Sequence, residues 1–60
     1  MKKQAKQVIL LTREEAKNYL SISLPTLHKW TADGILTSYR LGGRVYYKQH
    51  EILKALIATD

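Results

Sequence analysis

Apolar residues recur along the chain in two periods, one helical and one extended. A short apolar run at residues 8–11 predicts either a brief strand or the lead-in to a helix. The apolar side chains within residues 16–20 then follow the i, i+3, i+4 spacing of one helix face. Thr12 and Glu15 are typical of a capping box, in which each side chain accepts a hydrogen bond from the backbone of the other residue. We therefore predict a helix that starts at Thr12 and runs to about Leu20.

A second helix is predicted after a connection of about three residues, 21–23. Ser23 is a good N-cap, and Pro25 fits a first turn, where the backbone needs no donor. Asp33 and Gly34 end the helix, because glycine adopts the left-handed conformation that follows a helix C-terminus. Such a short connection makes the two helices cross steeply, so this part of the chain predicts a helix-turn-helix.

The spacing then changes to that of two strands, residues 37–41 and 44–48. Gly42-Gly43 between them suits the positive φ angles of a two-residue hairpin turn. Side chains alternate between the faces of such a hairpin, and we expect its basic residues to share the face opposite the core. The residues expected to point inward are Tyr39, Leu41, Val45 and Tyr47, and those expected to point outward are Arg40, Arg44, Tyr46 and Lys48.

A third helix is predicted from Gln49 to about Ala58, and it closes the core. Its apolar residues recur at helical spacing. The fold class that follows is α+β, mainly α: a small winged helix-turn-helix with a two-stranded antiparallel wing and a closing C-terminal helix. The side chains expected in the core include Leu27, Trp30, which is expected between the helices, Leu36, Ile52, Leu53, Leu56 and Ile57.

The composition limits the chain to one small domain without covalent or metal support. A domain of 60 residues buries only about 60% of the surface that its unfolded chain exposes. The absence of cysteine excludes disulfides and thiolate metal sites, and two isolated histidines, His28 and His50, do not make a metal site. We therefore predict no metal and no cofactor.

The charge points to a polyanionic partner. Ten Lys and Arg against five Asp and Glu give a net charge of +5, which indicates nucleic acid or an anionic surface. Residues 1–9 are predicted to form a basic, partly disordered arm before a domain at 10–58, although a solvated start without a specific role also fits. The apolar run is too short for a secretory signal or a membrane span, so we expect a cytoplasmic, nucleoid-associated protein.

Enzymatic chemistry has no support in the sequence. No set of nucleophile, base and acid can be assembled. Glu14 and Glu15 are explained by the positive end of the helix dipole. Gly42-Gly43 precedes a strand rather than a helix, so it does not form a phosphate-binding loop. We predict no catalytic residues.

Basic and polar side chains remain exposed once the core is assigned. The helix at 23–33 suits a DNA major groove, because a recognition helix meets base edges with its N-terminal half. The hairpin at 39–48 follows as a wing that would contact phosphates or a minor groove. An ordinary solvated surface explains any single residue about equally well. The candidates are Leu24, Pro25, Thr26, His28 and Lys29 on the helix, and Arg40, Arg44 and Lys48 on the wing.

The stretch LLTREEAKNYLSISLPTLHKWTADGILTSYRLGGRVYYKQHEI resembles the small winged helix-turn-helix domain of the excisionase family, which is related to MerR-type DNA-binding domains. The matching residues are Leu11-Thr12, Glu15-Ala16, Tyr19-Leu20, Ile22-Ser23, Thr26-Leu27, Trp30, Gly34, Leu36, and Tyr39-Arg40-Leu41-Gly42 with Arg44.

The resemblance implies a bacterial protein that binds double-stranded DNA. It would act as an excisionase (recombination directionality factor) or as a small transcriptional regulator of a mobile element. Its partners would be an integrase, a recombinase or further copies of itself. No small-molecule effector is expected, because the effector domain of MerR-type regulators is not present in these residues. By position, the family's DNA contacts fall on Ser23, Leu24, Pro25, Thr26, His28, Lys29, Arg40, Gly43, Arg44 and Tyr46.

Four of these positions depart from the family pattern. Leu24 and Pro25 stand where basic or polar residues are frequent, His28 where Tyr is frequent, and Tyr46 where a basic residue is frequent. These departures bear on affinity and base preference. They also leave open an alternative function, a protein-interaction module that uses an apolar patch of Leu24, Pro25 and Ile35.

Overall fold

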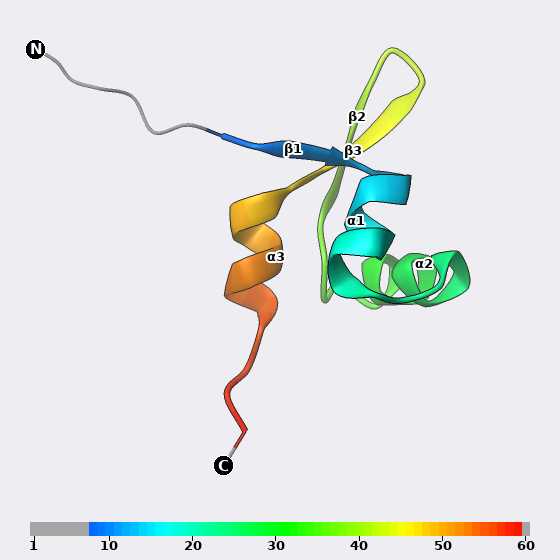
Figure 1. Ribbon diagram of the computed structural model, residues 1–60. Helices are drawn as coiled ribbons and strands as arrows, with labels where there is room; N and C mark the ends of the chain where they lie inside the picture. Colours follow the sequence, from blue (N-terminus) through cyan, green and yellow to red (C-terminus); the bar gives the residue numbers. More distant parts are fainter. Residues whose placement is uncertain (1–7, 60) are drawn as a thin grey trace, which may run out of the picture.

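The computed structural model describes residues 8–59, and the predicted winged helix-turn-helix fold is confirmed. The elements within this range follow in the order β1 (Leu10–Thr12), α1 (Arg13–Leu20), α2 (Leu24–Ala32), β2 (Ser38–Leu41), β3 (Arg44–Lys48) and α3 (Gln49–Ala55). In Figure 1 the turn between β2 and β3 projects beyond the packed elements. The predicted arm at 1–9 falls mostly on residues 1–7, which lie outside the described range.

The start of α1 is held by the predicted capping box. The backbone N–H of Thr12 donates to Oε1 of Glu15 over 2.9 Å, and the N–H of Glu15 donates to Oγ1 of Thr12 over 3.2 Å. Thr12 is also the last residue of β1. The same residue therefore joins the sheet to α1 and leaves little freedom in how α1 leaves the sheet.

The turn between α1 and α2 depends on a left-handed residue, Ser21, whose φ is 57°. This conformation lets the N–H of Ile22 donate to the carbonyl of Lys17 over 2.9 Å, which closes the end of α1. The half-buried Ile22 packs against the core. Ser23 then caps α2 by accepting a hydrogen bond from the N–H of Thr26 over 3.3 Å. Figure 1 shows α2 crossing α1 steeply, as a turn this short requires.

The wing is part of a three-stranded antiparallel sheet with the order β1-β3-β2. The apolar run at 8–11 was predicted to be either a brief strand or the lead-in to a helix. The strand is correct for residues 10 and 11, since β1 begins at Leu10. Gly42 and Gly43 have φ angles of 56° and 85°. Positive φ at both central residues is the requirement of a type I′ turn, one of the two favoured turns for a two-residue hairpin.

The register of the wing shows that the predicted faces were partly wrong. Leu41 pairs with Arg44, and Arg40 pairs with Val45. Residues opposite each other on antiparallel strands point to the same face, so Arg40 lies on the face of Val45, and Tyr39 and Leu41 lie on the face of Arg44. Leu41 is accordingly 74% exposed. The length of the turn decides which residues of β2 lie opposite which residues of β3. An error of one residue in this pairing moves every side chain of the strand to the other face.

The core lies where the helices meet β3. Among residues 8–59 it consists of five buried side chains: Ala16, Leu27, Leu36, Tyr47 and Ile52. The Thr31 hydroxyl donates to the carbonyl of Leu27 over 2.8 Å, so it accepts at 2.8 Å from the hydroxyl of Tyr47. The buried phenol is thereby satisfied. Trp30 differs from the prediction: it is only half-buried and packs against the edge of the cluster.

The third helix is shorter than predicted, because α3 ends at Ala55 and Leu56 already has extended backbone angles. Only Ile52 of its predicted core residues is buried. Leu53, Leu56 and Ile57 are 47%, 64% and 85% exposed. Apolar residues at helical spacing share one face only within a helix, so the spacing at Leu56 and Ile57, beyond the end of α3, does not place them in the core.

Candidate nucleic-acid interface

The first turn of α2 presents polar side chains that already bond one another. The hydroxyl groups of Ser23 and Thr26 lie 3.0 Å apart, in addition to the backbone bond of the cap. Pro25 is exposed, and Leu24 is half-buried. The turn is therefore rigid, and its two hydroxyl groups hold each other in place at the surface.

Farther along α2, two candidates face solvent. His28 is exposed, and the Nζ atom of Lys29 lies 3.3 Å from Oδ2 of Asp33, one turn later. The side chain of Lys29 is 73% exposed. An ion pair this exposed contributes little to stability, so Lys29 can exchange its carboxylate partner for another anion at small cost.

The wing divides its predicted site residues between its two faces. Arg44, Tyr46 and Lys48 share one face, and Arg40 lies on the other. The prediction that all three basic residues share a face is therefore wrong. Gly43 and Arg44 are exposed at the tip.

Lys48 is held within the protein. Its Nζ atom lies 4.4 Å from the centroid of the Tyr39 ring, a cation–π contact, and its side chain is half-buried. The Tyr39 hydroxyl donates to the carboxylate of Glu51 on α3, at 2.8 Å from Oε1 and 2.7 Å from Oε2. Lys48, Tyr39 and Glu51 thus connect the base of the wing to α3. Lys48 is less available to a ligand than the arginines.

The hydrogen bond to Glu51, with burial and the charge of Glu51 as smaller causes, raises the pKa of Tyr39 above its ordinary value of 10.0. The folded state therefore holds the phenol proton more tightly than the unfolded state does. This stabilisation is complete below about pH 10 and is lost as the pH rises through the folded-state pKa.

We expect Tyr39→Phe to remove part of the loss of stability at alkaline pH. The free energy of unfolding, measured with urea at about pH 9 and about pH 11, should fall further in the wild type than in Tyr39→Phe. Tyr46→Phe is the matched control and should retain the wild-type decline. Equal declines in all three proteins would contradict the role given to the bond with Glu51.

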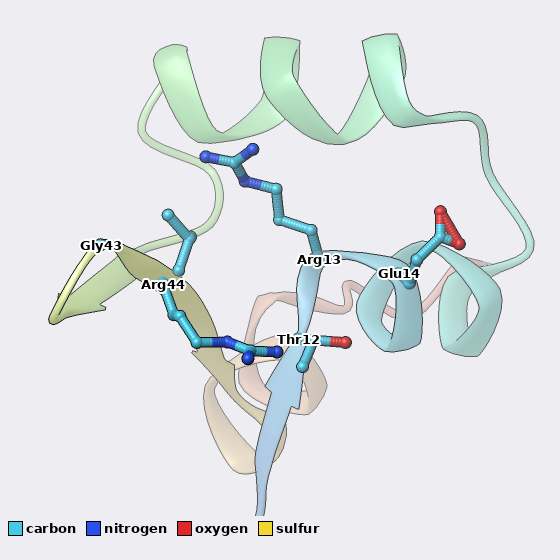
Figure 2. A pocket seen from close by; sticks show the side chains of 6 residues that line it. Thr12, Arg13, Glu14, Gly43 and Arg44 are labelled. Atoms are coloured by element: carbon cyan, nitrogen blue, oxygen red, sulfur yellow. The ribbon is translucent and has the colours of Figure 1, made fainter.

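A groove of about 350 Å³ lies between the start of α1 and the wing. Figure 2 shows Arg13 extending from the start of α1 toward α2, and Arg44 extending from the wing toward Thr12. The residues that line the groove are Thr12, Arg13, Glu14, Gly43, Arg44 and Val45. The structure thus places a second arginine, from a different element, in the lining of the same groove as the predicted Arg44.

Arg13 was missed as a site residue from the sequence, where it was treated only as part of a helix start. One signal could have found it: Arg13 is the first residue of α1, where the helix dipole disfavours a cation. Its placement beside the wing depends on the pairing of β1 with β3, which joins residues about 36 positions apart.

A second groove is apolar and has a volume of about 300 Å³. Ile35 lies in it, but Leu24 and Pro25 do not. Leu24 and Pro25 lie at the start of α2, whereas Ile35 follows its end. A nine-residue helix separates its two ends by roughly 13 Å. The predicted patch of these three residues is therefore not continuous. The lining residues are Leu20, Trp30, Ile35, Leu36, Ile52, Ala55, Leu56 and Ile57.

Comparison with known proteins adds one finding to this geometry. A family model described as a helix-turn-helix domain matches residues 10–58. No curated protein and no solved structure gives a significant match. Within residues 8–59, none of the helices has the length and apolar character needed to cross a membrane.

Proposed function

The chain belongs to the helix-turn-helix domain family, and we propose that it binds double-stranded DNA with the first turns of α2 in the major groove and the wing on the phosphate backbone. The observation that carries this proposal is the groove that Arg13 and Arg44, from two different elements, both line. Cationic side chains on a wing beside a helix-turn-helix are suited to phosphates, which supply most of the affinity of small DNA-binding domains.

Each element has a distinct role in this proposal. Base edges are met from the start of α2, whose capped first turn gives a fixed platform. The backbone is contacted from the wing tip. Arg40 would reach DNA only from the other face of the wing, and Lys48 contributes mainly through its charge. The proposed contacts are Ser23, Leu24, Pro25, Thr26, His28 and Lys29 from α2 and its cap, and Arg40, Gly43, Arg44 and Tyr46 from the wing, with Lys48 at its base.

The biological role that we propose is that of a mobile-element protein, acting as an excisionase (recombination directionality factor) or as a small transcriptional regulator. The resemblance of the two helices and the wing to the excisionase family supports this role. A single module makes few phosphate contacts, so its affinity alone is modest. Tight binding would require adjacent copies on the DNA or a bound integrase.

A salt titration tests the proposed DNA binding. We expect the affinity for a labelled duplex of about 20 base pairs, followed by fluorescence anisotropy, to fall with a log–log slope of about −3 to −5, which corresponds to roughly four or five phosphate contacts. Random-sequence DNA and DNA from upstream of the protein's own gene are compared. Tighter binding to the upstream DNA would support autoregulation or excision. Absence of binding at low salt would refute the proposal.

The apolar groove favours a second candidate function, a protein-interaction module. Its lining includes the exposed Ile35, Leu56 and Ile57. Capture of a partner that persists at high salt and in the presence of competing DNA would support this function. Loss of that partner in Ile35→Lys, without loss of DNA binding, would show that the two surfaces act separately.

A further inference from the structure

The charges of Arg13 and Arg44 are not neutralised within the described residues 8–59. Neither guanidinium forms a salt bridge there. Glu14, the only acidic residue that lines the groove, lies 3.8 Å from the Nζ atom of Lys17 and is 69% exposed. The groove lining thus carries two arginines without a salt bridge within residues 8–59 and one carboxylate, Glu14, whose ion-pair partner Lys17 is not part of the lining.

The position of Arg13 costs the helix some stability. The positive end of the α1 dipole is complemented by Glu14 and Glu15, whereas Arg13 at the first position opposes it. Arg13 also lies outside the capping box, which uses Thr12 and Glu15. Arg13 thus carries an electrostatic cost and has no salt-bridge partner within residues 8–59, and an anion bound from outside would offset that cost.

The backbone of the wing also borders the groove, at Val45. The last pair between β1 and β3 is Thr12 with Tyr46, so Val45 has no strand beside it on the β1 side. In a two-residue hairpin the closing pair, Leu41 and Arg44, exchanges its bonds across the turn, and the next residue directs its N–H and C=O outward. The N–H of Val45 therefore points to the β1 side of the wing, where Val45 lines the groove.

We propose that the DNA backbone passes through this groove and that Arg13 contacts it from α1 while Arg44 contacts it from the wing. This inference rests on the proposed function and adds to it a phosphate contact from outside the recognition helix and the wing. Guanidinium groups suit the site because their donors match the oxygens of a phosphodiester in a bidentate manner. Arg13 would thus set how closely α1 approaches the DNA.

The experiment compares four proteins: wild type, Arg13→Gln, Arg44→Gln and Lys54→Gln. Lys54 lies on α3 outside the groove, so its variant loses the same charge at a different place. On the same duplex of about 20 base pairs, each arginine variant should reduce the steepness of the salt slope by about 0.9 and weaken binding about 10-fold near 0.1 M salt. Lys54→Gln should keep the wild-type slope.

Two further measurements distinguish a lost DNA contact from a loss of folding or a general effect of salt. The melting temperature of Arg13→Gln should equal or exceed that of the wild type, because the variant removes a cation from the positive end of a helix dipole. The Nε–H resonance of Arg13 in the wild type should shift on addition of duplex and remain in place on addition of sodium chloride alone.

The outcomes separate this inference from the proposed function. If the wild type binds DNA and Arg44→Gln weakens binding, but Arg13→Gln behaves as Lys54→Gln does, the groove contact is wrong and the proposed function stands. If the wild type does not bind DNA at low salt, the proposed function is refuted and the inference with it. The inference is supported only if both arginine variants show a shallower salt slope than the wild type and Lys54→Gln does not.

Discussion

Charge reversal in Arg44→Glu is expected to weaken DNA binding about 30- to 100-fold near 0.1 M salt. A charge-assisted hydrogen bond contributes about 1.5–3 kcal/mol, and about 1.4 kcal/mol corresponds to a factor of ten. The substituted carboxylate also repels the phosphate that the guanidinium attracted. The affinity is measured by anisotropy with the same labelled duplex as the wild type.

The fold should survive this change, because Arg44 is exposed and forms no salt bridge within the described range. An unchanged melting temperature would establish this. Lys54→Glu is the control, since it alters the net charge by the same amount on α3 and should reduce affinity only through the general field of the protein. Wild-type affinity in a folded Arg44→Glu protein would count decisively against the wing as a phosphate contact.

Leu27→Ala is expected to remove a large part of the stability of the domain. Leu27 is fully buried at the centre of the core. Truncation of a buried leucine costs about 2–5 kcal/mol through lost transfer free energy and the cavity left behind. A domain of this length has a free energy of unfolding of about 3–9 kcal/mol. Urea unfolding followed by circular dichroism should show a strongly lowered midpoint or no folded baseline.

Leu41→Ala is the matched control for the core, because it removes the same atoms from a side chain that is 74% exposed. Its free energy of unfolding should stay within about 0.5 kcal/mol of the wild type. Similar losses of stability in the two variants would show that the core is not centred on Leu27.

Signals that act over a few residues were reliable predictors in this chain. The capping box of Thr12 and Glu15, the cap at Ser23 and the turn at Gly42-Gly43 are all present. Each depends on hydrogen bonds or φ angles within a four-residue window, so the side chains alone specify them.

The wrong predictions concern relations between distant residues or the extent of an element. The faces of β2 relative to β3 are exchanged if the register across the turn is shifted by one residue, and the faces predicted for Arg40 and Leu41 were wrong in this way. The apolar spacing at Leu56 and Ile57 resembled a core face, although the core was already closed by Ile52. Apolar residues are not all buried in a chain this short, because the surface is large relative to the volume.

The candidate site was predictable only in part for the same reason. The exposed start of α2 and the wing tip follow from local patterns. The groove beside Arg13 does not, since it exists only because β1 adds to the edge of β3 and brings the start of α1 next to the wing. Long-range strand pairing of this kind leaves almost no trace in a single sequence.

The third strand covers only the base of the wing. β1 pairs only with residues 46–48 of β3, so residues 40–45 belong to a ribbon of two strands, and such a ribbon has little stability of its own. The wing therefore has a gradient of stiffness, firm near α3 and compliant near Gly43. A compliant tip can follow local variation in the width of a DNA groove without disturbing the core. In the proposed complex, the protein would then tolerate sequence differences beneath the wing, and any discrimination between bases would fall to α2.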